Sequence, residues 1–297
     1  MKKTTGSADG AQVMRKKKSR FKEIWGRFKK NKSAIVGLVL FSIILLMVIF
    51  ADVLAPYSAS IEPNIPARLQ GPSAEHIMGT DSFGRDIFAR LVHGSRNSLL
   101  VGIGAVFIGM IVGGILGAVS GYYGGKVDNI IVRITDMVMC IPMMLLVLTL
   151  VAALGSSLMN VLLAMMISNI PGYTRVVRSA VLTVVDQDYI EAAHSCGTPN
   201  RWIIFKHIIP NAIGPIIVQT TMSIGSMILN AAAISFLGMG IQPPTPEWGA
   251  MLNEARNFMI QCPYMVFFPG AAIGITALGL NLMGDGLRDA LDPKLKD

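Results

Sequence analysis

The polar side chains that could bind another molecule are concentrated in one segment of the hydrophobic second half of the chain, residues 186–210. Asp188 is placed to cap a helix, and Glu191, three residues later, is placed to complete a capping box. Gly197 is placed to end that helix, and Thr198-Pro199 is placed to begin another. The spacing therefore predicts a short helix, a glycine break and an amphipathic helix.

The residue types in this segment predict non-covalent docking. Ala192 and Ala193 beside an exposed Glu191 would give a flat surface with one charged anchor, suited to a groove on a partner. Pro210 is expected to end or kink the second helix. Two other interpretations stay open at this point. The segment could be a structured loop that only closes a helical hairpin, or a helix-turn-helix that reads DNA, although its position between apolar spans disfavours the latter.

The composition indicates a membrane protein. Of the 297 residues, 52% are hydrophobic and 15% are charged, and the mean hydropathy is +0.55, whereas soluble domains carry about 25% charged residues. The net charge of +8 could suggest nucleic acid, but 12 of the 26 Lys and Arg residues lie within residues 1–32. A basic tail before the first span is typical of the cytoplasmic side near anionic lipid. We therefore expect membrane lipid, and no nucleic acid, as a partner.

The chain offers no pattern for metal, ATP or proton chemistry. Cys140, Cys196 and Cys262 lie far apart without a Cys-x-x-Cys pair, and the four histidines form no metal-binding spacing. No phosphate-binding Gly-x-x-x-x-Gly-Lys motif is present. No ionisable residue is expected at the middle of a span, where proton-driven carriers keep such groups. We predict no catalytic residue and no cofactor in this chain, so the energy for any transport must come from another chain.

The hydropathy pattern predicts an all-α integral membrane protein with six spans, the third interrupted by Pro142 and the fourth broken near Asn169-Ile170-Pro171. An interfacial helix over residues 87–97 is expected to lead into the second span. Residues 248–258 are expected to dip back into the membrane. The predicted spans are residues 33–54, 98–120, 134–154, 158–170, 215–240 and 264–283.

Small residues recur every four positions along the second span and into the turn after it. This spacing places them on one helical face, where another backbone can approach closely. The stripe consists of Ala105, Gly109, Gly113, Gly117, Gly121 and Gly125. We interpret it as a packing surface rather than a phosphate loop.

Several motifs resemble one family. Glu191-Ala192-Ala193, followed by Gly197 and Ile209-Pro210, resembles the EAA loop of permease subunits in bacterial ATP-binding-cassette importers. Residues 76–86, 242–249 and 281–293 resemble the dipeptide/oligopeptide branch of that family, in its C-type subunit. The resemblance extends from about residue 33 to the C-terminus, and the basic tail lies outside it. It implies a type I importer permease with a MetI-like core.

The resemblance also implies partners and sites. The partners would be a second homologous permease subunit, two ATPase subunits that bind ATP and Mg, and an extracytoplasmic solute-binding protein. The residues that would couple the chain to the ATPases are Asp188, Tyr189, Glu191, Ala192, Ala193, Gly197 and Pro210. The residues that would contact the binding protein are Gly79, Asp81, Arg85, Asp86, Pro243, Glu247 and Trp248.

Polar residues inside the spans are candidates for a substrate pathway, although such residues also bond neighbouring helices. The pathway candidates are Ser168, Asn169, Gln219, Ser223 and Asn230. The predicted organisation is a basic cytoplasmic tail with an amphipathic helix (1–32), a first transmembrane helix (33–54), an extracytoplasmic loop (55–97), a five-helix core (98–285) containing a cytoplasmic coupling loop (175–213) and an outer loop (241–264), and a cytoplasmic tail (286–297).

The distribution of Lys and Arg predicts that both termini are cytoplasmic, in a multi-pass protein of the bacterial inner membrane. With the resemblance, the expected function is import of di- or oligopeptides driven by ATP hydrolysis in other chains. The same branch also includes permeases for nickel chelates, glutathione and antimicrobial peptides, and the sequence does not separate these cargoes. An ion-coupled secondary carrier and a membrane-anchored scaffold are the alternatives from other classes.

Overall fold

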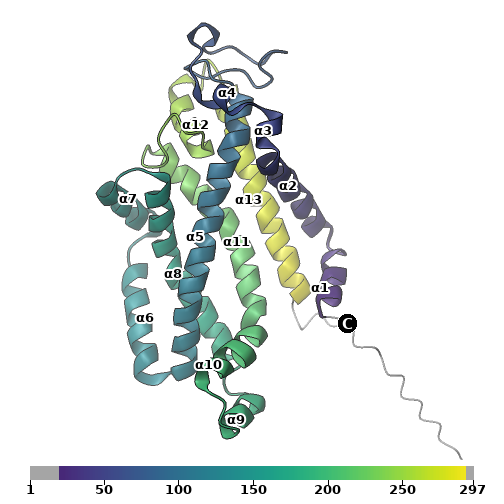
Figure 1. The fold of residues 1–297 in the computed structure, drawn as a ribbon, viewed down its shortest axis with the longest axis vertical. Coiled ribbons are helices and arrows are strands. Elements are labelled where there is room, and N and C mark those ends of the chain that lie inside the picture. The colour runs from purple at the N-terminus through teal and green to yellow at the C-terminus, as the bar shows by residue number, and fades with distance from the viewer. Residues whose placement is uncertain (1–19, 292–297) are drawn as a thin grey trace, which may run out of the picture.

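The protein is all-helical in its computed structural model, which describes residues 20–291 (Figure 1). Residues 1–19 of the predicted basic tail and residues 292–297 of the predicted C-terminal tail lie outside the described residues. The helices are α1 (Arg20–Phe28), α2 (Lys32–Ile49), α3 (Ala51–Leu54), α4 (Tyr57–Ile61), α5 (Ile87–Tyr123), α6 (Gly125–Met139), α7 (Met143–Leu154), α8 (Leu158–Leu182), α9 (Asp188–Ser195), α10 (Asn200–Trp202), α11 (Ile209–Phe236), α12 (Trp248–Ala255) and α13 (Tyr264–Leu291). Short 3-10 turns cover Ile65–Ala67 and Arg256–Phe258, and a π-helical segment covers Ile203–Ile208.

Four helical stretches of the described chain are long and apolar enough to cross a membrane, and a fifth qualifies if a bent pair is one span. The four are α2, α5, residues 200–236 and α13. The bent pair is α6 and α7, which meet at 82° around Pro142. The predicted interruption of the third span is therefore confirmed, because the proline ring and its missing N–H stop the helix there. The count of six spans stays a prediction.

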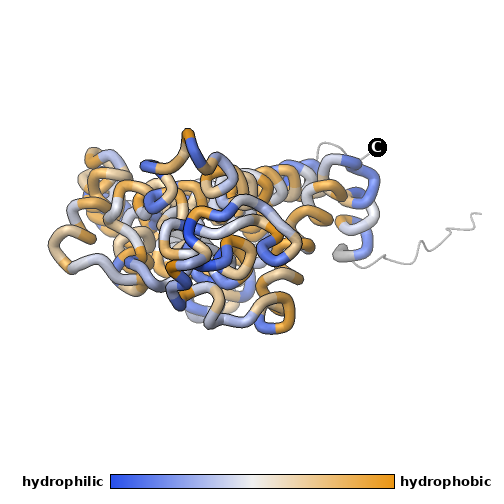
Figure 2. The backbone as a smooth tube through the Cα atoms, turned by 90° about the horizontal axis from the view of Figure 1, so that it is seen from above, coloured by the Kyte–Doolittle hydropathy of each residue, from blue (hydrophilic) through white to orange (hydrophobic). Residues whose placement is uncertain are grey.

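The long helices run side by side and leave polar connections at their two ends (Figure 1). One end carries α4 and α12 and is called the α12 end; the other carries α9 and α10 and is called the α9 end. Seen along the long axis, orange hydrophobic stretches lie on several sides of the bundle, whereas blue stretches gather in the connections (Figure 2). An apolar outer surface of this kind suits contact with lipid.

The first described helix and the last one end close together, toward the α9 end (Figure 1). Phe28, Ala34 and Ala290 form a small buried cluster between them. Asn31 caps α2 and also donates a hydrogen bond from Nδ2 to Asp289 Oδ2 at 3.0 Å. The amphipathic helix that the sequence predicts therefore exists as α1, and its apolar side packs against α13.

The glycine stripe of α5 packs against α8, as the spacing predicts. A Cβ placed on Gly113 would lie 2.5 Å from the Ile170 carbonyl oxygen, and one on Gly117 would lie 2.4 Å from the Thr174 carbonyl oxygen. A side chain at either position would force the two backbones apart. The stripe ends before Gly125, which starts α6 at a φ of +53° in open space.

The helix predicted to lead into the second span is continuous with it, whereas the predicted break in the fourth span is wrong. α5 runs without interruption from Ile87, so the expected interfacial helix and the second span are one helix. α8 continues through Pro171 to Leu182 instead of breaking near residue 170. Membrane helices tolerate an internal proline when neighbouring groups compensate for the freed carbonyl. The Asp86 carboxylate begins α5 by accepting a hydrogen bond from the Ala89 N–H at 2.8 Å.

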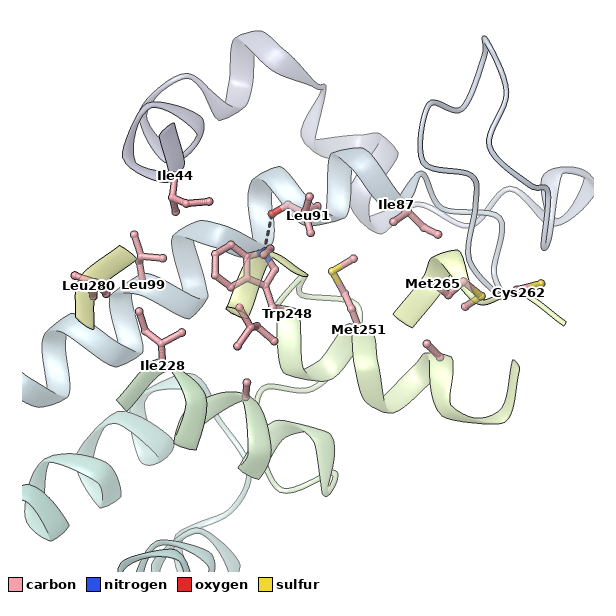
Figure 3. Packing of buried hydrophobic residues seen from close by; sticks show 14 residues of the cluster. Ile44, Ile87, Leu91, Leu99, Ile228, Trp248, Met251, Cys262, Met265 and Leu280 are labelled. Carbon is pink, nitrogen blue, oxygen red and sulfur yellow. Dashed lines mark hydrogen bonds between the residues drawn. The ribbon is translucent and has the colours of Figure 1, made fainter. Parts of the chain in front are cut away.

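The core consists of apolar clusters that follow one another along the bundle. At the α12 end, Trp248 lies at the centre of a cluster between α5, α11, α12 and α13 (Figure 3). Its indole N–H donates to the Leu91 carbonyl at 2.9 Å. A second cluster joins α5, α7, α8 and α11, and a third packs α8 against the segment that carries α9. Each end of the bundle is therefore fixed to the same long helices.

Candidate functional site

At the α9 end, the largely exposed helix α9 projects beyond the long helices (Figure 1). Ile190 is the buried residue of this helix, at 1% exposure, and it packs in the cluster that contains Val181 and Ile203. The remaining surface of α9 is available for contact. One buried anchor on an otherwise exposed helix is suited to an element that transmits contact with another molecule.

The predicted coupling residues lie on this projecting surface, with one exception. Asp188, Tyr189, Glu191 and Ala192 are exposed on α9, and Ala193 is half-buried against the cluster. The two carboxylates lie in the first turn, where the helix dipole stabilises negative charge. Gly197 is exposed immediately after the helix. Pro210 is separate from this surface, because it belongs to the first turn of α11.

Gly197 ends α9 as predicted, but the predicted capping box is wrong. Gly197 has a φ of +73°, and the Thr198 N–H donates to the Ala193 carbonyl at 3.1 Å, a glycine-dependent helix end. At the other end, Gln187 occupies the N-cap position without a side-chain hydrogen bond, and Asp188 is already the first helical residue. The carboxylate of Asp188 therefore contributes through charge near the N-terminus instead of capping it.

The second helix of the segment also differs from its prediction. Pro199 occupies the N-cap position of α10, so Thr198 is not the cap. Pro210 does not end a helix: the chain continues from α10 through the π-helical segment Ile203–Ile208 into α11. A π turn widens the backbone, and it removes the conflict that a proline ring has with a regular preceding turn. The loop predicted at 175–213 is accordingly shorter, and the projecting segment comprises residues 183–202.

A tyrosine that the sequence analysis did not single out holds the projecting segment. The Tyr122 hydroxyl, in the last turn of α5, donates to Asn200 Oδ1 at 2.9 Å and lies 3.1 Å from His194 Nε2. The rings of Tyr122 and His194 stack, with centroids 5.9 Å apart and planes 12° apart. No local signal could have identified these contacts, because His194 and Asn200 lie 72 and 78 residues away in sequence.

The same end of α5 is bound to two further helices. Arg178 on α8 donates from Nε and Nη2 to the two carboxylate oxygens of Asp128 on α6, both at 2.6 Å. The Ser120 hydroxyl on α5 donates to the same carboxylate. Such a bidentate pair fixes orientation as well as distance. The last turn of α5 therefore joins α6, α8, α9 and α10.

The α12 end contains a buried cluster of four charged residues. Arg85 Nε donates to Asp81 Oδ2 at 2.7 Å, and Arg85 Nη2 donates to Glu254 Oε2 at 2.9 Å. Arg90 Nη1 donates to both of these carboxylates. The side chains of Asp81, Arg85 and Arg90 are no more than 3% exposed, and that of Glu254 is 11% exposed. Two positive and two negative groups neutralise one another and tie α12 to the start of α5.

The residues predicted to contact a binding protein mostly build this end of the chain. Asp81 and Arg85 belong to the charge cluster, and Gly79 is buried with a φ of +79°. Glu247 is 2% exposed and caps α12 by accepting hydrogen bonds from the N–H groups of Gly249 and Ala250. Trp248 is fully buried. These five buried residues therefore shape the α12 end from within, and any contact they make with a partner is indirect in this conformation.

The two remaining residues of that set are closer to the surface. Pro243 is exposed, and Asp86 is half-buried beside His76, with 2.8 Å between His76 Nδ1 and Asp86 Oδ2. At the same end, Asp52 is paired with Arg96 in an exposed salt bridge, with 2.8 Å between Arg96 Nη2 and Asp52 Oδ2. Hydrogen bonds from the Arg96 guanidinium hold the pKa of the Asp52 carboxyl below its usual value.

The predicted pathway residues lie on two helices, α8 and α11. Gln219 Nε2 donates to Ser223 Oγ at 3.0 Å within α11, and Ser168 Oγ donates to the Met165 carbonyl at 2.7 Å within α8. Asn169 faces Gly109 on α5, and Asn230 lies near Met143 on α7. A groove of about 340 Å³ does open between α8 and α11, nearer the α9 end. Its lining residues are Arg175, Val176, Ser179, Ala180, Thr183 and Pro215.

No group of three or more His, Cys, Asp or Glu residues that could hold a metal ion occurs in the described part of the chain. The site at the α9 end is therefore a surface for contact: an exposed helix with two carboxylates, one hydrophobic anchor and a tyrosine link to a membrane-spanning helix. A bundle of apolar helices with this projecting element fits a membrane protein that contacts another molecule at the α9 end.

Comparison with known proteins gives the family. Residues 105–297, well over half of the chain, match the family described as binding-protein-dependent transport system inner membrane component. Residues 19–72 match the N-terminal transmembrane domain of oligopeptide transport permease C. The chain therefore belongs to the family of binding-protein-dependent transport system inner membrane components. Within that family it is a multi-pass permease of the peptide branch.

Curated relatives agree over nearly the whole chain. The dipeptide transport system permease protein DppC of Alkalihalophilus pseudofirmus is 50% identical over 94% of this chain and 91% of its own length. The glutathione transport system permease protein GsiD of Escherichia coli is 45% identical over 92% of this chain and 90% of its own length. A chain of the MetNI methionine ABC transporter, solved in inward facing conformations, shares the fold with a TM-score of 0.57 and 17% identity, over 68% of this chain and 96% of that one.

Proposed function

We propose that this chain is the transmembrane subunit of an ATP-driven importer for di- or oligopeptides. In this proposal ATP is hydrolysed by two partner ATPase subunits, a second related permease completes the pathway, and an extracytoplasmic binding protein delivers the cargo. The single observation that carries the proposal is the projecting helix α9, which is exposed except for Ile190 and is joined to the long helices. The dipeptide permease DppC, which is 50% identical to this chain, supports peptide as the cargo.

The projecting helix suggests how energy reaches the membrane. An ATPase that binds the exposed carboxylates and the small residues of α9 would displace this helix when it closes on ATP. Displacement of Ile190 would be felt by its buried neighbours, because packed cores respond by shifting as units. The role of the chain is then to convert movement of α9 into opening and closing of the bundle.

The α9 end is expected to face the cytoplasm. The positive-inside rule supports this orientation, since 21 Lys and Arg residues are assigned to the inner side and 5 to the outer side of the 26 in the chain. Cys196, exposed at the end of α9, can report the orientation directly. With Cys140 and Cys262 replaced by Ser and Ala, a membrane-impermeant maleimide should label Cys196 in inside-out vesicles and not in sealed cells. Labelling in sealed cells would reverse the orientation.

The proposed function is tested by transport in a defined system. The complex is purified by an affinity tag on this chain, and the subunits that co-purify are identified. The complex is then placed in liposomes that contain ATP, and the binding protein is added outside. A labelled dipeptide should accumulate only with ATP and binding protein. Glutathione, suggested by the GsiD relatives, and a nickel chelate are the parallel arms. If glutathione accumulates and the dipeptide does not, the proposed cargo is glutathione instead of a peptide of this kind. Accumulation by this chain without ATPase subunits would overturn the proposal.

A further inference from the structure

The end of α5 is one of the places where the projecting segment meets the long helices, and the Tyr122 side chain makes polar contacts there. Tyr122 touches both helices that flank Gly197: its hydroxyl donates to Asn200 on α10 and accepts from His194 on α9. A hydroxyl can donate once and accept at the same time, so this geometry assigns the His194 Nε2 as the donor. The Tyr122 hydroxyl therefore binds one residue before Gly197 and one residue after it.

The contact is rigid on the α5 side. The Tyr122 ring packs against the buried cluster of the α9 end and stacks on His194. Two residues earlier, Ser120 is bonded to the Asp128 carboxylate that Arg178 also holds. A displacement of α9 therefore acts through Tyr122 on a helix end that is already connected to α6 and α8.

α5 carries any such displacement to the other end of the molecule. Its 37 residues form one helix, about 55 Å long at the rise of an α-helix and longer than the ~30 Å hydrocarbon layer. At its far end, Arg90 donates hydrogen bonds to Asp81 and to Glu254 of α12. The two ends of α5 therefore contact the projecting segment and α12 directly.

We propose that Tyr122 is the positioning residue that links α9 and α10 to α5, so that movement of the projecting segment reaches α12 through α5 as well as through α11, into which α10 continues. This inference rests on the proposed function, since it concerns how that coupling is delivered. Tyr122 touches neither cargo nor ATP, and it acts through His194 and Asn200.

The test compares Tyr122→Phe with Tyr123→Phe in the liposome system, measuring labelled dipeptide imported per ATP hydrolysed. Tyr122→Phe keeps the ring and its stacking but removes both hydrogen bonds. We expect the amount of dipeptide imported per ATP hydrolysed to fall roughly five- to thirtyfold. Loss of about two neutral hydrogen bonds would shift the equilibrium between linked and unlinked α9 by a factor of this size. Tyr123, which is 52% exposed and has no side-chain hydrogen bond to the projecting segment among the described residues, is the matched control. Tyr123→Phe should keep the wild-type ratio.

A second measurement separates positioning from a loss of folding. If Tyr122 acts through its two partners, the triple variant Tyr122→Phe/His194→Ala/Asn200→Ala should be no worse than His194→Ala/Asn200→Ala, because both hydrogen bonds are already gone. An additive loss, or a wild-type ratio in Tyr122→Phe, would overturn the inference. Glu191→Lys is measured in parallel. If Glu191→Lys abolishes import while Tyr122→Phe does not, the proposed function stands and this inference fails; if neither variant affects import, the proposed function fails as well.

Discussion

Replacing Glu191 by Lys is expected to abolish ATP-driven import while the chain still inserts and assembles into the proposed complex. Glu191 is exposed in the first turn of α9, and it makes no side-chain hydrogen bond within the described residues, so its carboxylate is free for a partner. A lysine would place a positive charge where a partner is expected to present one. Losing a charged contact at an interface costs about 2–5 kcal/mol, which corresponds to a fall in import of roughly 30-fold or more.

Gly197→Val tests the same coupling by a different physical route. With φ at +73°, a β-branched residue is strained, and the left-handed conformation alone costs about 1–2 kcal/mol. We expect α9 to be reoriented and import to fall with it. Nothing lies within 4 Å of a Cβ built at Gly197, so the effect would come from the backbone and not from crowding.

The controls for both variants are placed outside the projecting segment. Glu62→Lys makes the same charge change at an exposed position beyond α4, and Gly26→Val adds the same side chain in open space on α1 without a positive φ. Import, ATP hydrolysis and the amount of assembled complex are measured for all four variants. Wild-type import in both Glu191→Lys and Gly197→Val would refute α9 as the coupling element.

Local geometry could be predicted from the sequence where one residue type determines it. Gly197 was expected at a helix end because glycine adopts the left-handed conformation at low cost, and the glycines of α5 were expected to face another backbone because their spacing matches the helical period. The capping box failed for a related reason. Asp188 and Glu191 have suitable types and spacing, but the helix begins one residue earlier in register, with Gln187 as the N-cap. A shift of a single residue lies below what a pattern can resolve.

Contacts between distant residues could not be predicted. Tyr122 is one aromatic residue at the end of a span until His194 and Asn200 are brought to it. Asp81 and Arg85 lie in a polar, turn-rich segment, and such residues are normally solvated. The structure buries them because Glu254, 169 residues from Arg85, completes their neutralisation. The prediction that Asp81, Arg85, Glu247 and Trp248 contact a binding protein rests on the family resemblance, which carries no information on their burial.

The buried charge cluster gives the second large expected effect. Asp81→Asn should lower the unfolding temperature of the protein in lipid nanodiscs by roughly 10 °C. The substitution removes one of the two carboxylates that neutralise Arg85 and Arg90, and it leaves a buried positive charge without full compensation. Breaking a buried pair costs about 3–5 kcal/mol, and each kcal/mol shifts the unfolding temperature of a domain of this size by about 2–4 °C. Arg90 cannot compensate with its other nitrogens, because its buried Nε and Nη2 atoms have no hydrogen-bond partner within residues 20–291.

Asp52→Asn is the matched control for this prediction, because it makes the same chemical change at the same end of the bundle. The Asp52 side chain is 68% exposed, and that of its partner Arg96 is 39% exposed. Exposed pairs contribute little to stability, since the charges stay solvated when the pair is lost. The unfolding temperature of Asp52→Asn should therefore match that of the wild type. If the two variants unfold at the same temperature, the cluster at Asp81 does not hold α12 on α5, and α5 could not carry movement from Tyr122 to the α12 end through Arg90.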